Sequence, residues 1–167
     1  MAQFKRTVSV IDTDTVPKEA PVEYDVNIVD GQISENGSAL VSITAKNTGD
    51  STYPILPYYK GRSAQTGDPG ILLYELRAAD SPSEEYKPEC IDDPSPTHDG
   101  VLFTTEAYVS KIEPGKIKTF KYIIADDPSV HGCIPPGEYR FERDQHFATS
   151  GDRIEFRWGF TLQITNS

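Results

Sequence analysis

The most regular hydrophobic pattern in the chain lies near its C-terminal end. Large apolar side chains occupy six consecutive even positions there, with polar residues or glycine between them: Ile154, Phe156, Trp158, Phe160, Leu162 and Ile164. An α-helix would scatter these side chains around all of its sides, whereas a β-strand places them on one face. The pattern therefore predicts a long strand with one face in a core.

Shorter alternating segments earlier in the chain predict further strands. Residues 22–28 and 41–45 alternate apolar and polar side chains, and Asn36-Gly37 between them has the sequence of a hairpin turn. Other strands are expected at residues 53–59 (an edge strand, because of two prolines), 71–78, 103–109, 120–124 and from Tyr139 onward. No segment has the periodicity of an amphipathic helix. We therefore predict an all-β fold, an immunoglobulin-like antiparallel sandwich of about seven to nine strands.

A change of composition near residue 20 suggests how the 167 residues are organised. Residues 1–20 are rich in Thr and Asp and predict an extended N-terminal arm or tether, whereas residues 21–167 predict one domain. Residues 57–70 and the proline-rich residues 80–100 are expected to form loops. Because long loops in compact domains are frequently functional, we expect binding there.

Three short motifs follow one another in an order typical of a known group of domains. They are VSITAKNTG at residues 41–49, IEPG at 112–115 leading into FKY at 120–122, and PGEYRF at 136–141. The chain thereby resembles bacterial and archaeal immunoglobulin-like domains, including the family named after the intracellular proteinase inhibitor of bacilli. This resemblance implies a sandwich over residues 22–165 and, for that family, an inhibitory role.

The acidic domain after a Thr/Asp-rich segment also resembles the exposed part of haloarchaeal surface lipoproteins. That resemblance implies a lipid-bearing cysteine before residue 1, which would be the expected route of membrane attachment. The acidity of the chain is also typical of proteins from a salt-rich habitat.

The net charge of the chain is −10 and its pI is near 4.7. Such a field repels the phosphates of nucleic acids and anionic lipid head groups. We therefore expect a protein partner or another cell-surface component, and no nucleic acid.

Motifs that carry catalysis are missing from the sequence. It contains no Gly-x-Ser-x-Gly, no His-Glu-x-x-His, no phosphate-binding glycine loop and no dinucleotide fingerprint. We therefore expect a protein that is not an enzyme and that uses no cofactor.

Cys90 and Cys133 are the two cysteines of the chain. A disulfide between them would stabilise the fold by about 4 kcal/mol in the chain-entropy model and would fit an oxidising compartment. Two free thiols remain an alternative, as does a metal site that adds His98 and His131, although this spacing matches no common zinc site. The disulfide is the first expectation, and with it an extracellular or cell-surface location. A cytoplasmic location is the alternative, because the first residues lack the apolar stretch of a leader.

Tyrosines beside the prolines supply the candidate binding residues. Tyr58, Tyr59 and Tyr86 are our candidates, because tyrosine presents a large area at low entropic cost, and we expect the first two to be exposed. Asn36 begins an acceptor sequence for N-glycosylation within the expected hairpin turn. The function predicted is that of a non-catalytic cell-surface binding, adhesion or assembly module. The alternatives are a proteinase inhibitor that uses residues 80–100 and a metal-binding protein.

Overall fold

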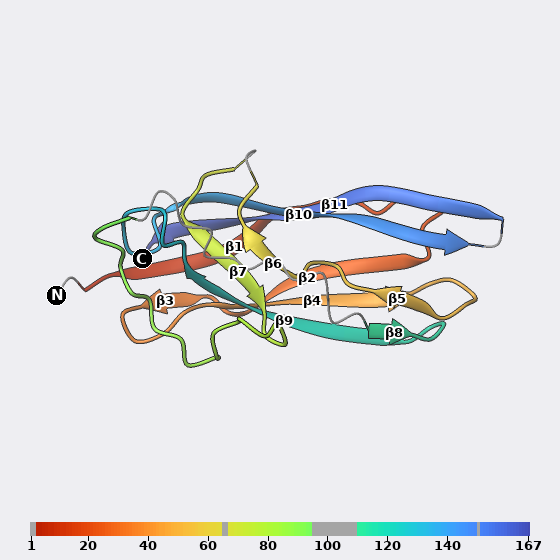
Figure 1. Cartoon of the computed structure of the whole chain (residues 1–167), viewed down its shortest axis with the longest axis horizontal. Coiled ribbons are helices and arrows are strands. Elements are labelled where there is room, and N and C mark those ends of the chain that lie inside the picture. Colours follow the sequence, from red (N-terminus) through yellow and green to blue (C-terminus); the bar gives the residue numbers. More distant parts are fainter. Residues whose placement is uncertain (1–2, 65–66, 95–109, 150) are drawn as a thin grey trace.

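The fold is all-β, and the strands that the structure describes all pair antiparallel (Figure 1). The computed structural model of the chain describes residues 3–64, 67–94, 110–149 and 151–167. Within these ranges lie no helix and eleven strands: β1 (Lys5–Thr13), β2 (Val22–Asp30), β3 (Gln32–Ser34), β4 (Leu40–Asn47), β5 (Tyr53–Ile55), β6 (Lys60–Arg62), β7 (Ile71–Glu75), β8 (Ser110–Ile112), β9 (Ile117–Asp126), β10 (Gly137–Thr149) and β11 (Asp152–Asn166).

Two main sheets form the layers of a sandwich (Figure 1). One sheet has the order β10-β11-β1-β3 and the other the order β2-β4-β9-β7-β6, while β5 and β8 form a separate small sheet. The predicted sandwich is confirmed. The described strands outnumber the expected seven to nine because β3, β6 and β8 have three residues each, too short for a visible alternation; β5 lies within the edge strand predicted at residues 53–59.

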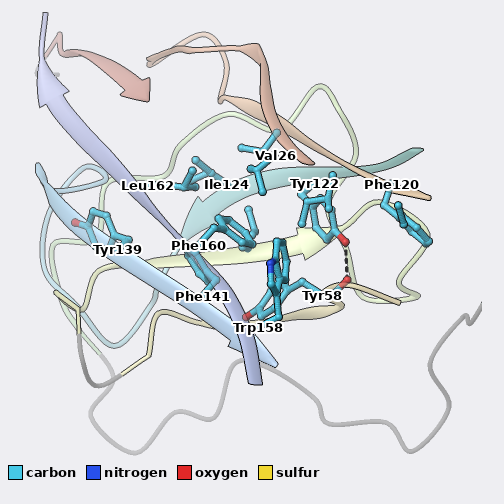
Figure 2. Close-up of a cluster of buried hydrophobic side chains, with 14 of the residues drawn as sticks. Val26, Tyr58, Phe120, Tyr122, Ile124, Tyr139, Phe141, Trp158, Phe160 and Leu162 are labelled. Atoms are coloured by element: carbon cyan, nitrogen blue, oxygen red, sulfur yellow. Dashed lines mark hydrogen bonds between the residues drawn. The ribbon is translucent and has the colours of Figure 1, made fainter. Parts of the chain in front are cut away.

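The core lies between the two main sheets, where the alternating apolar faces meet (Figure 2). On β11, the side chains of Trp158, Phe160 and Leu162 are each at most 1 % exposed. Glu155 and Arg157 lie at odd positions of the same strand and are exposed. From the opposite sheet, the side chains in contact with this core are Val22, Val26, Val41, Ile43, Ala45, Ile71, Leu73, Phe120, Tyr122 and Ile124. The predicted one-sided burial of the C-terminal strand is thus confirmed.

The N-terminal segment is a strand of the sandwich, so the expectation of an arm is wrong for residues 5–13. β1 lies between β11 and β3 in its sheet and pairs with β11 from Arg6 to Thr13. Phe4 and Val8 are buried in the core. The sequence concealed this strand because its apolar alternation is short and its other face carries Ser and Thr, which are equally common in arms.

A second apolar cluster covers the outer face of β7 and β9. It contains Leu72, Tyr74, Ile123 and Ala125, with Leu40, Leu76 and Tyr86 packed against it. The loop predicted at residues 80–100 therefore packs on the sheet through Tyr86 in its described part, residues 80–94. Residues 95–109, which include the strand predicted at 103–109, lie outside the described residues.

Candidate binding site

A cavity of about 380 Å³ lies between β6 and β10, the edge strands of the two main sheets. Its walls come from the segment that leads into β6, from β6 itself and from the middle of β10. The lining residues are Tyr58, Tyr59, Lys60, Gly61, Arg62, Glu142 and Arg143. Four of these seven residues have a charged side chain, and these are Lys60, Arg62, Glu142 and Arg143.

Three hydrogen bonds from side chains fix the segment that forms one wall. Arg143 Nη1 donates to the carbonyl oxygen of Leu56 at 2.7 Å, and Gln145 Nε2 donates to that of Pro57 at 3.0 Å. The Tyr122 hydroxyl donates to the carbonyl oxygen of Tyr58 at 2.7 Å, which Figure 2 shows as a dashed line. Buried carbonyl groups need hydrogen-bond donors, and this segment belongs to no strand. The three side chains therefore donate the hydrogen bonds that a neighbouring strand would otherwise provide. The wall is therefore held in place from both sheets.

Arg143 is the charged residue on the inward face of β10. The odd-numbered residues of this strand face the core, and its other members are Tyr139, Phe141, Gln145 and Phe147. Burial lowers the pKa of the Arg143 guanidinium, and Tyr24, Tyr122 and Asp144 oppose this effect to a smaller extent. Within the described residues, the Arg143 guanidinium forms no ion pair with a carboxylate, and its one hydrogen bond there is the one to Leu56. A partly buried cation without a carboxylate partner is costly, so this position is electrostatically incomplete.

The other cations of the cavity have carboxylate partners. Lys60 Nζ lies 2.8 Å from both carboxylate oxygens of Asp80, and its side chain is 3 % exposed. Arg62 Nε lies 2.9 Å from Asp127 Oδ2. Their charges are therefore largely compensated before any ligand enters.

Glu142 is the acidic residue of the cavity wall, and two arginines neutralise it. Arg140 Nε and Arg157 Nη1 each lie 3.3 Å from its carboxylate oxygens. Its charge is thereby shared with cations outside the cavity.

Tyr58 lines the cavity but is only 6 % exposed, so the expectation of an exposed side chain is wrong for this residue. Its ring packs against Phe141 and Phe160, with centroids 5.6 and 6.2 Å away (Figure 2). The sequence could not reveal this burial, because two nearby prolines obscure which face of the segment points inward.

The hydroxyl of Tyr58 lies beside Gly61. A Cβ atom on Gly61 would lie 3.0 Å from this oxygen, so the absence of a side chain leaves room above it. Among the described residues the hydroxyl has no hydrogen-bond partner, and burial raises the pKa of Tyr58. It therefore remains a protonated donor at neutral pH.

The two remaining tyrosine candidates lie in different places. Tyr59 lines the cavity and is half-buried, with the Lys60 ammonium 5.6 Å from its ring centre. Tyr86 belongs to the outer cluster on β7 and β9, where its hydroxyl donates to Asp126 Oδ2 at 2.6 Å. The structure thus brings Tyr58 and Tyr59 together and separates Tyr86 from them.

Cys90 and Cys133 form a disulfide, which confirms the expectation from the sequence. Beside it, the backbone groups of Ile91 and Gly132 exchange two hydrogen bonds of 2.9 Å, so residues 76–94 are tied to the loop before β10. A disulfide sulfur is not the thiolate that zinc binds, so the four-residue metal site is not formed. The described part of the chain holds no group of three or more His, Cys, Asp or Glu side chains that could bind a metal ion; His98 lies outside it.

Asn36 is exposed in the turn after β3, where the backbone N–H of Ser34 donates to the carbonyl oxygen of Gly37 at 2.9 Å. The predicted turn is therefore present. Among the described residues no helix could cross a membrane. Comparison of the chain with protein-family models, curated proteins and solved structures finds no match.

The charged residues of the cavity, above all Arg143, were missed by the sequence reasoning. A signal for Arg143 was present, because the odd positions of residues 139–147 are otherwise aromatic or amide side chains. A charged residue within an inward-facing series is rare unless it has a specific task. Lys60, Arg62 and Glu142 carry no comparable signal, since charged side chains in short segments usually lie in solvent.

Proposed function

We propose that this chain is a non-catalytic binding module, exported to the cell surface, that recognises a protein partner through the cavity between β6 and β10. The observation that carries the proposal is Arg143, a partly buried cation that lines the cavity and has no ion-pair partner among the described residues. Such an arrangement costs stability, and a ligand that supplies the missing partner recovers it. The disulfide supports the export part of the proposal.

We further propose that the sandwich is immunoglobulin-like. One contact supports this: the Tyr139 hydroxyl donates to the carbonyl oxygen of Pro135, four residues upstream, at the start of β10. A tyrosine near the start of a strand that bonds back to the preceding corner is typical of immunoglobulin sandwiches. Burial raises the pKa of Tyr139 to about 12, so this donor stays protonated over the physiological range.

Site-specific photocrosslinking tests the binding role. In one variant of the chain, a photoreactive phenylalanine analogue replaces Tyr59 in the cavity wall. In a second variant it replaces Val29, which is 53 % exposed on β2. We expect a discrete crosslinked product with the cell-envelope fraction of the source organism from the first position. Excess unmodified protein should suppress it, and the second position should not give it. Equal products from both positions would contradict a binding role for the cavity.

Proteinase inhibition through residues 80–100 stays a prediction. A panel of serine proteinases, incubated with the intact protein at micromolar concentration, tests it directly. Unchanged proteinase activity throughout the panel would exclude it.

A further inference from the structure

One of the three cations that line the cavity forms no ion pair among the described residues. Lys60 is paired with Asp80, Arg62 with Asp127, and Glu142 with two arginines outside the cavity. Arg143 forms no ion pair with a carboxylate among the described residues, although Asp144 acts on it electrostatically. A single additional negative charge in the cavity would therefore give Arg143 an ion-pair partner.

The donors available to such a charge are already held in position. A guanidinium has five N–H groups, and Arg143 uses Nη1 to hold Leu56, which restrains the rest of the group. The Tyr58 side chain is nine-tenths buried, and its unpartnered hydroxyl lies at Gly61 in the same cavity wall. Pre-positioned donors lose little entropy when a ligand binds.

The size and charge of the cavity limit the ligand. Its volume of about 380 Å³ is suited to one side chain or chain end, near the lower limit for ligand pockets. A phosphate dianion would bring two negative charges close to the carboxylate of Glu142, whereas a monoanion would bring only one. The geometry and charge of a guanidinium match a carboxylate well.

Building on the proposed function, we infer that the cavity binds a carboxylate group of the partner protein, through the guanidinium of Arg143 and the hydroxyl of Tyr58. The carboxylate belongs to an acidic side chain or to a chain end. Because the chain has a net charge of −10, long-range repulsion slows the approach of an acidic partner, so recognition relies on this local cation.

Amide NMR spectra of the full chain test the inference with defined probes. N-acetyl-glutamate N-methylamide presents a side-chain carboxylate, N-acetylalanine presents a chain end, and N-acetyl-glutamine N-methylamide is the uncharged match to the first. We expect saturable shifts at Tyr59, Gly61 and Arg143 with one or both carboxylates, at millimolar concentrations typical of so small a ligand. The stronger of the two identifies the source. The amide should bind at least about tenfold more weakly, because it lacks the charge.

Three variants locate the site. Arg143→Gln should weaken carboxylate binding about tenfold or more, and Tyr58→Phe about three- to tenfold, because each removes a donor. Arg153→Gln, on the same hairpin with a side chain 66 % exposed, should change it less than about twofold. Tyr58→Phe keeps the bond between Arg143 and Leu56, so it remains informative if Arg143→Gln does not fold.

Several results would overturn the inference. Equal responses to carboxylate and amide, shifts outside the cavity, tighter binding of inorganic phosphate, or unchanged affinity in Tyr58→Phe would each do so. If these appear while Tyr59 still gives its specific crosslink, the binding role stands and the ligand class is wrong. If the crosslink is also absent, the proposed function fails as well.

Discussion

Trp158 and Asp14 connect the middle of the core to the end of β1: the indole Nε1 donates a hydrogen bond of 3.0 Å to the carbonyl oxygen of Asp14. The backbone N–H of Asp14 donates to the carbonyl oxygen of Gly159 at 2.9 Å. Its carboxylate Oδ2 accepts from the backbone N–H of Gly159 at 3.0 Å and from Arg140. One residue just after β1 thus ties that strand to both β10 and β11.

Removal of the Asp14 carboxylate should destabilise the fold. Asp14→Ala leaves Arg140 and the backbone N–H of Gly159 without their acceptor, and we expect a loss of about 1–3 kcal/mol in the free energy of unfolding. Asp12→Ala is the control, because Asp12 is 68 % exposed and its carboxylate lies 3.9 Å from Arg140. It should change stability by less than about 0.5 kcal/mol. Urea unfolding followed by tryptophan fluorescence measures both, and equal effects would refute this role of Asp14.

Gln145 should be among the most sensitive polar positions of the core. It is 2 % exposed, accepts from the Tyr24 hydroxyl at 2.8 Å and donates to Pro57 at 3.0 Å. Gln145→Leu leaves both partners unpaired, and we expect a loss of about 2–4 kcal/mol. Gln163→Leu, on the outward face of β11, has no such partners and should cost less than about 1 kcal/mol. A thermal melt of each variant compares them. A similar melting temperature for the two would contradict the role of Gln145 in holding residues 56–58 in place.

The disulfide should contribute substantially to stability. Its loop spans a sequence separation of 43 residues, and in the chain-entropy model its removal costs about 4 kcal/mol. The double variant Cys90→Ala/Cys133→Ala should therefore unfold at much lower urea concentration than the wild type. Thiol titration of the native, non-reduced protein should find no free thiol. Two reactive thiols would contradict both the bond and the proposed export.

Alkaline pH should destabilise the chain through its buried tyrosines. Burial raises the pKa of Tyr24, Tyr58 and Tyr122 above the unfolded value near 10. Above that pH the unfolded chain releases protons that the folded chain retains, so the stability present below pH 10 is lost as the pH rises. The slope is about 1.4 kcal/mol per pH unit for each such tyrosine.

Urea titrations between pH 8 and pH 11.5 measure this effect. We expect nearly constant stability up to pH 9 and a steep fall above pH 10. In Tyr58→Phe the fall should be shallower by the contribution of one tyrosine. An identical slope in the variant and the wild type would show that Tyr58 is not shielded as the structure has it.

The sequence by itself determined the class of the fold and the faces of its long strands. The alternation at residues 154–164 requires a strand with one buried face, because successive side chains of an extended backbone point to opposite sides. The Asn36 turn and the two-cysteine count also pointed to features that the structure contains. These signals are local, carried by residues within a few positions of one another.

Only the tertiary structure decided how β1 joins the sheet and how the cavity is built. Arg143 meets the backbone of Leu56, 87 residues away, and Trp158 meets Asp14, 144 residues away. A periodic pattern shows which face of a strand is buried but not which strand lies opposite, because the pairing energy depends on residues far apart in sequence. For the same reason the sequence predicted an exposed side chain for Tyr58, which lies beside two prolines. In the structure, the rings of Phe141 and Phe160 pack against it and bury it.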